Sequence, residues 1–268
     1  MTDNFEQQNN VGQDVNTIQV TISDQKTPIV ILFGPPASGK TMVLLRMIRY
    51  FSNNHYKFRP DRLFRGGNDA DYERLCDEFE NEKPFANTTP GGTKDIEFLL
   101  FTIRDSNSHS LFQFLEAPGE HYYNGKNVQE DFPVYIETII GLTTPKTWVI
   151  LLELDWGTVQ DRTRYVRQVG VLKDKMSPDD KIIFLFNKAD KRKDLFADNG
   201  KPNQKAFVTE IENQYPGLLN QFDRGWFYRN PEKLCFSAGG FKKTLQGEQW
   251  VYKPSDDWYC SKLLDALV

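Results

Sequence analysis

The sequence has little cysteine, no long apolar run and no excess of positive charge. Its three cysteines, Cys76, Cys235 and Cys260, have neither the spacing of a zinc site nor that of a disulfide framework, so a reducing compartment is expected. The formal net charge of -4 lacks the basic excess typical of nucleic-acid-binding proteins, and we expect no nucleic-acid partner. The longest apolar stretches, such as WVILLEL at 148 to 154, are too short to span a bilayer.

Targeting signals are also missing. The start MTDNFEQQNN is polar and has no apolar segment of the kind that a secretory signal needs. Residue 2 is Thr, whereas myristoylation requires Gly, and the final DALV is not a prenylation motif. We therefore expect a cytoplasmic protein with no direct membrane anchor.

The composition is that of a folded domain, with 39% hydrophobic and 26% charged residues. Residues 1 to 16 are rich in Asn, Gln and Asp and are expected to form a disordered tail. No linker divides the rest, so residues 17 to 268 are interpreted as one domain. The polar stretch 52 to 87 is expected to be an insertion within it, with a short helix at about 69 to 81.

Short apolar runs alternate with segments of helical period. PIVILF at 28 to 33 precedes a helical face formed by Leu44, Met47, Ile48 and Phe51. The runs at 96 to 103 and 111 to 116 flank turn-forming residues and predict a hairpin, whereas TWVILLEL and IIFLF are typical of strands buried on both faces. This alternation predicts an α/β fold with three α/β/α layers, in which a mostly parallel sheet has one antiparallel strand.

The segment GPPASGKT, at 34 to 41, has the spacing of a phosphate-binding loop (P-loop) between a strand and a helix. Successive main-chain N–H groups of such a loop surround the β-phosphate, and glycine is needed where a Cβ would block the backbone. Lys40 would reach the β- and γ-phosphates, and the Thr41 hydroxyl would bind Mg²⁺. The residues expected to contact the nucleotide phosphates are Gly34, Pro36, Ala37, Ser38, Gly39, Lys40, Thr41 and Met42.

The segment NKAD at 187 to 190 ends the apolar run IIFLF. A carboxylate at Asp190 can accept hydrogen bonds from the N1–H and the exocyclic amine of guanine, whereas adenine would leave these groups mismatched. Asn187 would tie this segment to the phosphate-binding loop, and the stem of Lys188 would lie against the base. The two motifs together indicate a guanine nucleotide.

With these two motifs in this order, residues 28 to 268 resemble the Ras-like, translation-factor-related (TRAFAC) class of P-loop GTPases. The resemblance implies a six-stranded Ras-like sheet, GTP or GDP as ligand and Mg²⁺ as cofactor. CFSAGG at 235 to 240 is similar to the Ser-Ala loop of this class, which implies that Ser237 and Ala238 adjoin the base and that the Ala238 N–H contacts guanine O6. Gly239 stands where the family usually has Lys.

The stretch EAPG at 116 to 119 occupies the place of the family's DxxG. The resemblance implies that Glu116 replaces the Asp that holds Mg²⁺ through water, and that the Gly119 N–H contacts the γ-phosphate. Glu120 and His121 follow, where relatives have a residue that orients the attacking water, so Lys40, Glu120 and His121 are the catalytic candidates. A carboxylate at this place opposes the phosphate charge, which indicates slow or absent hydrolysis. An exposed loop without a catalytic role fits Glu120 and His121 equally well.

The family also needs a threonine in its first switch, and the sequence offers Thr88, Thr89 and Thr93. Thr89 is the first choice as a metal ligand beside Thr41 and Glu116. A solvated connection is the competing interpretation of this stretch. Arginines of the insertion could reach the phosphates or could form a solvated basic face; they are Arg59, Arg62 and Arg65.

Three functions are consistent with these motifs. The first is a Mg²⁺-dependent GTPase switch, in which segments 86 to 95 and 119 to 130 order around GTP and an unidentified effector protein reads their shape. The second is a guanine-nucleotide-binding scaffold without hydrolysis. The third is a P-loop ATPase or phosphotransferase in which Asp155 is the Mg²⁺ carboxylate. The resemblance to family members with an insertion before the first switch implies a bacterial GTPase of a multi-protein system, and the chain resembles the double-GTPase proteins linked to bacterial conflict systems.

Overall fold

The structure is a computed structural model that describes residues 19–65, 69–81, 99–123, 128, 131–223, 230–243 and 250–268. The tail predicted at 1 to 16 lies outside the described residues, as do Thr88, Thr89 and Thr93. The described part of the chain has no helix with the length and apolar character needed to cross a membrane.

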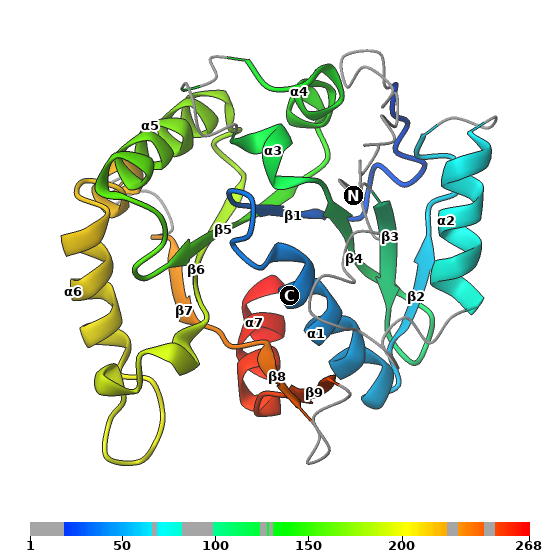
Figure 1. The fold of residues 1–268 in the computed structure, drawn as a ribbon. Coiled ribbons are helices and arrows are strands. Elements are labelled where there is room, and N and C mark those ends of the chain that lie inside the picture. Colours follow the sequence, from blue (N-terminus) through cyan, green and yellow to red (C-terminus); the bar gives the residue numbers. More distant parts are fainter. Residues whose placement is uncertain are drawn as a thin grey trace, which may run out of the picture.

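A seven-stranded sheet in the order β2-β3-β4-β1-β5-β6-β7 forms the centre of the molecule (Figure 1). Among its strands only β3 runs against the rest, because β2 and β4 pair with it antiparallel and the other pairs are parallel. The strands are β1 (Ile29–Phe33), β2 (Lys57–Pro60), β3 (Leu99–Arg104), β4 (Ser110–Glu116), β5 (Lys146–Glu153), β6 (Lys181–Asn187) and β7 (Glu232–Cys235).

The mostly parallel α/β architecture, the hairpin and its one antiparallel strand are thus confirmed. The sheet has one strand more than the six expected, because β2 pairs with the edge of β3, Phe58 opposite Ile103. This strand comes from the stretch predicted as an insertion. The ring of Phe79 lies between those of Phe58 and Phe101, at centroid distances of 5.4 and 4.9 Å, and joins the following helix to this edge of the sheet.

Helices cover both faces of the sheet. In Figure 1, α1 and α7 lie together below the central strands, and α3, α4 and α5 lie above them. The helices are α1 (Lys40–Asn53), α2 (Ala70–Asn81), α3 (Gly119–Tyr122), α4 (Val134–Gly141), α5 (Val159–Lys175), α6 (Gln204–Gln214) and α7 (Asp257–Leu267). The helix expected at 69 to 81 is α2.

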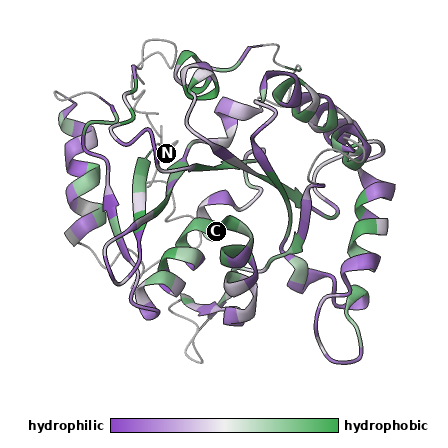
Figure 2. Ribbon diagram, turned by 180° about the vertical axis from the view of Figure 1, so that it is seen from behind, coloured by the Kyte–Doolittle hydropathy of each residue, from purple (hydrophilic) through white to green (hydrophobic). Residues whose placement is uncertain are grey.

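The apolar pattern explains this layering. All five residues of β1 are buried, and the predicted face of α1, which includes Leu44, Met47 and Phe51, packs into the core. Figure 2 shows the central strands as hydrophobic and the outward faces of the helices as hydrophilic. α5 begins with a reciprocal capping box between Thr158 and Asp161, which satisfies two main-chain donors at its first turn.

Between β7 and α7 in the sequence, the chain forms a separate two-stranded antiparallel sheet. It is formed by β8 (Gly239–Lys243) and β9 (Trp250–Pro254). The sequence analysis did not predict this hairpin, which begins within the SAGG segment at Gly239.

Candidate functional site

The carboxyl ends of four parallel strands meet at one edge of the sheet. There β1 leads into the loop at 34 to 39, β4 ends at Glu116, β6 ends at Asn187 and β7 leads into the loop at 236 to 238. Open α/β sheets bind ligands outside this edge, where the connecting loops form a crevice. All the motifs identified in the described part of the sequence therefore lie at the same edge.

The loop between β1 and α1 needs its second glycine. Gly39 has a φ of 88°, in the left-handed region that favours glycine. A Cβ atom there would lie 2.7 Å from Nδ2 of Asn187. The predicted phosphate-contacting residues occupy this turn and the first helical turn: Gly34, Pro36, Ala37, Ser38, Gly39, Lys40, Thr41 and Met42.

The Lys40 side chain folds back into this loop. Its Nζ donates hydrogen bonds to the carbonyl oxygens of Gly34, at 2.9 Å, and Pro35, at 3.2 Å, and the residue is only 5% exposed. Burial lowers the pKa of Lys40, while the charges of Glu116 and Glu120 oppose that shift. A desolvated ammonium group held by two main-chain carbonyls of the loop is well placed to bind a multiply charged anion such as a phosphate.

Thr41 and Glu116 meet at the mouth of the loop. The Thr41 hydroxyl donates to Oε1 of Glu116 at 2.9 Å, and Glu116 is buried. A hydroxyl and a carboxylate are hard oxygen donors, which suits Mg²⁺ in a site where waters and phosphate oxygens complete the octahedron. Among the residues that the structure describes, no cluster of three or more His, Cys, Asp or Glu could hold a metal without such help.

Gly119 approaches the loop from the end of β4. A Cβ atom at this position would lie 2.5 Å from the Pro36 nitrogen and 2.6 Å from Nζ of Lys40. Such distances exclude any side chain in this arrangement, so glycine is required by close contact between the EAPG segment and the phosphate-binding loop.

Glu120 and His121 follow on the single turn α3. Glu120 is exposed and close enough to Lys40 to favour its charged form. The His121 ring is held against α4, with Nδ1 2.6 Å from the hydroxyl of Tyr135. Burial lowers the pKa of His121, Glu120 raises it and Lys40 lowers it. Both residues therefore adjoin the Lys40 charge.

The NKAD segment contacts the phosphate-binding loop directly. Asn187 Nδ2 donates to the Ser38 carbonyl at 2.8 Å, and Lys188 Nζ donates to the Ala37 carbonyl at 3.1 Å. Lys188 also pairs with Glu153, at 2.5 Å, which lies opposite Asn187 on the neighbouring strand β5. The sequence analysis missed Glu153, although an acidic residue at the end of the apolar run WVILLE was a signal for it.

Asp190 is joined to the loop after β7. The Ser237 hydroxyl donates to Oδ1 of Asp190 at 2.6 Å, and the Gly239 N–H donates to the same hydroxyl at 3.2 Å. The Ala189 N–H bonds the Phe236 carbonyl at 3.0 Å, and Ala238 is buried in the same loop. The SAGG segment thus orients the carboxylate of an exposed Asp190.

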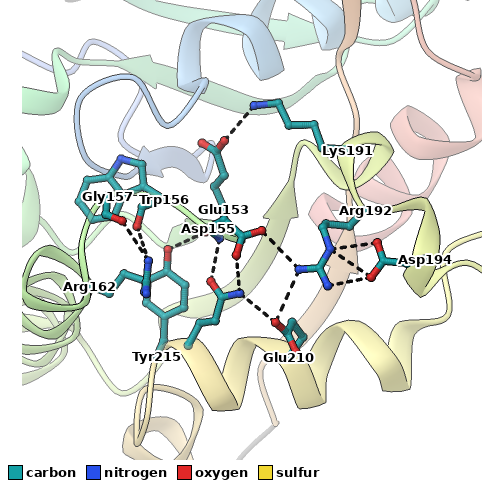
Figure 3. A network of polar contacts seen from close by, with 11 residues as sticks. Glu153, Asp155, Trp156, Gly157, Arg162, Lys191, Arg192, Asp194, Glu210 and Tyr215 are labelled. Carbon is teal, nitrogen blue, oxygen red and sulfur yellow. Dashed lines mark hydrogen bonds and ion pairs between the residues drawn. The ribbon is translucent and has the colours of Figure 1, made fainter.

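Asp155, together with Glu153, lies in the polar network shown in Figure 3. It bonds to Gln214 at 3.0 Å and pairs with Arg192 at 3.4 Å, and its side chain is 68% exposed. A cleft of about 170 Å³ lies here beside Lys188. The ATPase interpretation assigns the Mg²⁺ carboxylate to Asp155. In the structure the carboxylate that contacts Thr41 is that of Glu116.

Two of the three arginines named in the predicted insertion, Arg62 and Arg65, form ion pairs within that segment. Arg62 pairs with Asp77 at 2.6 Å and with Glu80 at 2.7 Å, both on α2. Arg65 pairs with Asp69 at 2.8 Å. These ion pairs attach α2 to the end of β2.

No protein-family model and no curated protein matches this sequence. Among solved structures, the chain is similar to a nucleolar GTP-binding protein 1 from Plasmodium falciparum. The identity is 14%, the match covers 92% of this chain and 88% of the other, and the TM-score is 0.41.

Proposed function

We propose that this protein binds GTP and GDP together with Mg²⁺, hydrolyses GTP slowly and acts as a conformational switch for a partner protein. The observation that carries the proposal is the bond from Asn187 to Ser38, which fixes a base-recognition segment at a defined position beside the phosphate-binding loop. In this scheme residues 17 to 268 form one GTPase domain with an insertion at 52 to 87, and the protein acts in the cytoplasm.

Base selection follows from hydrogen-bond chemistry. The Asp190 carboxylate, oriented by Ser237, accepts from the N1–H and the exocyclic amine of guanine. Adenine offers an acceptor at N1, so it would leave the carboxylate opposed by a lone pair. The Lys188 stem, fixed at its end by Glu153 and Ala37, lies against the base, and the Ala238 N–H meets guanine O6.

Phosphate binding uses the loop and the start of α1. Main-chain N–H groups of the loop and the Lys40 ammonium hold the β- and γ-phosphates. Thr41 and Glu116 would hold Mg²⁺, and Thr89 would join them in the triphosphate state. The ion would neutralise charge between the β- and γ-phosphates.

The contact between Gly119 and the loop supports a switch at this point. Gly119 and Lys40 are in close contact, so a γ-phosphate bound between them would change the packing of the segment that follows β4. Segments 86 to 95 and 119 to 130 would carry that change to the surface, where the effector protein binds.

An alternative is a guanine-nucleotide-binding scaffold in a multi-protein bacterial system, of the kind suggested by the similarity to double-GTPase conflict-system proteins. The observation in its favour is the exposed carboxylate of Glu120 beside Lys40, where a hydrolytic enzyme needs a group that orients water. Phosphate release is the measurement that separates the two functions.

The test is a titration of purified protein with GTP, GDP and ATP, with and without Mg²⁺, followed by an assay of phosphate release. We expect tight GTP and GDP binding that Mg²⁺ strengthens, weak ATP binding and slow release that is lost in Lys40→Ala. Guanine-selective binding without release supports the scaffold. Equal affinity for ATP and GTP contradicts both.

A further inference from the structure

Helix α1, which begins in the phosphate-binding loop, contains a buried arginine. Arg46 is 1% exposed, and its Nη2 donates to the main-chain carbonyl of Ser255 at 2.9 Å. Its Nε lies 3.4 Å from the Ser255 hydroxyl, and Nη2 also pairs with the carboxylate of Asp257. A buried guanidinium group is stable only with such partners, and these lie in the connection after β9 and at the first residue of α7.

The same segment bonds to the loop that orients Asp190. The Ser255 hydroxyl donates to the Ser237 carbonyl, and the Ser255 N–H donates to the Ala238 carbonyl at 3.4 Å. The Tyr252 hydroxyl donates to that Ala238 carbonyl as well. The loop at 237 to 238 is therefore held from the side of β9.

The join between this loop and the hairpin is tightly packed. Gly239 has a φ of 96°, and a Cβ atom there would lie 2.2 Å from the Lys253 carbonyl oxygen and 2.6 Å from the Ser255 nitrogen. The guanidinium of Arg49, one turn after Arg46, lies 5.9 Å from the centre of the Tyr252 ring. Helix α1 thus supports the hairpin at two successive turns.

We infer that Arg46 is a positioning residue for base specificity. It fixes Ser255, Ser255 fixes the main chain at Ser237, and the Ser237 hydroxyl aims the Asp190 carboxylate. This inference rests on the proposed function. Its consequence is that a residue on the phosphate-binding helix, with no place in the base pocket itself, controls guanine selectivity.

Inosine diphosphate is the probe that isolates this effect. Hypoxanthine retains the N1–H and O6 of guanine but lacks the exocyclic amine, so the ratio of the Kd values for IDP and GDP reports the amine's bond to Asp190. Both ligands carry the same diphosphate, so a change in phosphate binding cancels in the ratio.

The experiment measures Kd for GDP and IDP by calorimetry in full-length wild type, Arg46→Gln, Ser255→Ala and Asp257→Asn. Asp265→Asn is the matched control. Asp265 lies on the same helix as Asp257, but its ion pair, at 3.4 Å, is with Lys262 and not with Arg46. We expect the IDP/GDP ratio to fall about fivefold or more in Arg46→Gln and Ser255→Ala, which is on the scale of one lost hydrogen bond. The ratio should also fall in Asp257→Asn, because that substitution removes the charge that pairs with Arg46. Asp265→Asn should keep the wild-type ratio.

A near-ultraviolet circular dichroism spectrum identifies folded variants. If Arg46→Gln does not fold, Ser255→Ala and Asp257→Asn decide, because both leave the guanidinium in place. Folded variants that weaken GDP and IDP equally, or that bind both as the wild type does, overturn the inference and leave the proposed function intact. A wild type that does not prefer GDP to ADP overturns both.

Discussion

The side-chain amide of Asn187 donates to the main-chain carbonyl of Ser38 at 2.8 Å. This buried bond joins two segments that lie about 150 residues apart in the sequence, and the bond from Lys188 to the Ala37 carbonyl reinforces it. Gly39 follows Ser38 directly, and a Cβ atom at residue 39 would lie 2.7 Å from the donor of this bond.

Gly39→Ala is expected to separate the two segments. An L-residue at a φ of 88° is strained by roughly 1–3 kcal/mol, and the added Cβ would meet Nδ2 of Asn187 at 2.7 Å. We expect a lower free energy of unfolding by about that amount and a GDP affinity reduced at least tenfold. Chemical denaturation and calorimetry measure the two effects.

Gly200→Ala is the control, since Gly200 also has a positive φ, 72°, but its Cβ would meet nothing within 4 Å. Equal GDP affinities in the two variants would contradict a special role for Gly39.

Glu116→Gln tests the proposed Mg²⁺ site. Glutamine can still accept the bond from Thr41, so the substitution removes charge and preserves shape. We expect the gain in GDP affinity between EDTA and millimolar Mg²⁺ to shrink about tenfold or more. Glu116→Asp keeps the charge and should retain more of the gain. A glutamine variant with the full Mg²⁺ effect would exclude Glu116 as a ligand.

Glu120→Gln tests the cause of slow hydrolysis. An amide can both accept from the attacking water and donate towards the γ-phosphate, and it removes a negative charge beside Lys40. We expect single-turnover phosphate release to rise roughly tenfold, on the scale of one added transition-state donor. Glu137→Gln, on α4, is a control for a general effect of charge. A rate that falls in Glu120→Gln would mean that the carboxylate acts as a base.

The contact between His121 and Tyr135 predicts a pH dependence of stability. Burial lowers the pKa of His121 below its ordinary value of 6.5. Below pH 6.5 the unfolded chain therefore binds a proton that the folded chain resists, and stability falls as pH falls from 6.5 through the folded-state pKa. Burial also raises the pKa of Tyr135, so its hydroxyl keeps its proton and can donate to the neutral ring.

His121→Gln should reduce this dependence, because it keeps a partner for Tyr135 and does not titrate. Urea unfolding of nucleotide-free protein at pH 7.5, 6.5 and 5.5 measures it as the difference in unfolding free energy between wild type and variant. His109→Gln is the control, since His109 is exposed on the hairpin between β3 and β4. A difference that stays constant over this range would rule out titration of His121.

Local chemistry explains what could be predicted from the sequence. Each of the two main motifs is short and continuous: the phosphate-binding loop spans residues 34 to 41, and the base-recognition motif NKAD spans four residues. Each comes at the end of an apolar strand that is recognisable by itself. Their contact through Asn187 followed from the common edge of a parallel sheet.

Features that depend on distant pairing could not be predicted in this way. The strand KFRP of β2 has four residues, and its pairing requires the edge of β3 about 45 residues later. The strand GGFKK of β8 has no apolar alternation. Arg46 is buried because the segment before α7, 209 residues further on, covers it, and nothing in the helical pattern around Arg46 indicates that contact.

Base choice by Asp190 is the central claim, and Asp190→Asn tests it most directly. Xanthine keeps the N1–H of guanine but has a carbonyl in place of the amine, so an asparagine amide would pair with it through one acceptor and one donor. The measurement is Kd for GDP, XDP and ADP in wild type and Asp190→Asn. The account predicts that wild type prefers GDP and that the variant loses GDP affinity by at least tenfold and gains affinity for XDP. A wild type that binds ADP as tightly as GDP, or a variant with an unchanged preference for GDP, would contradict it.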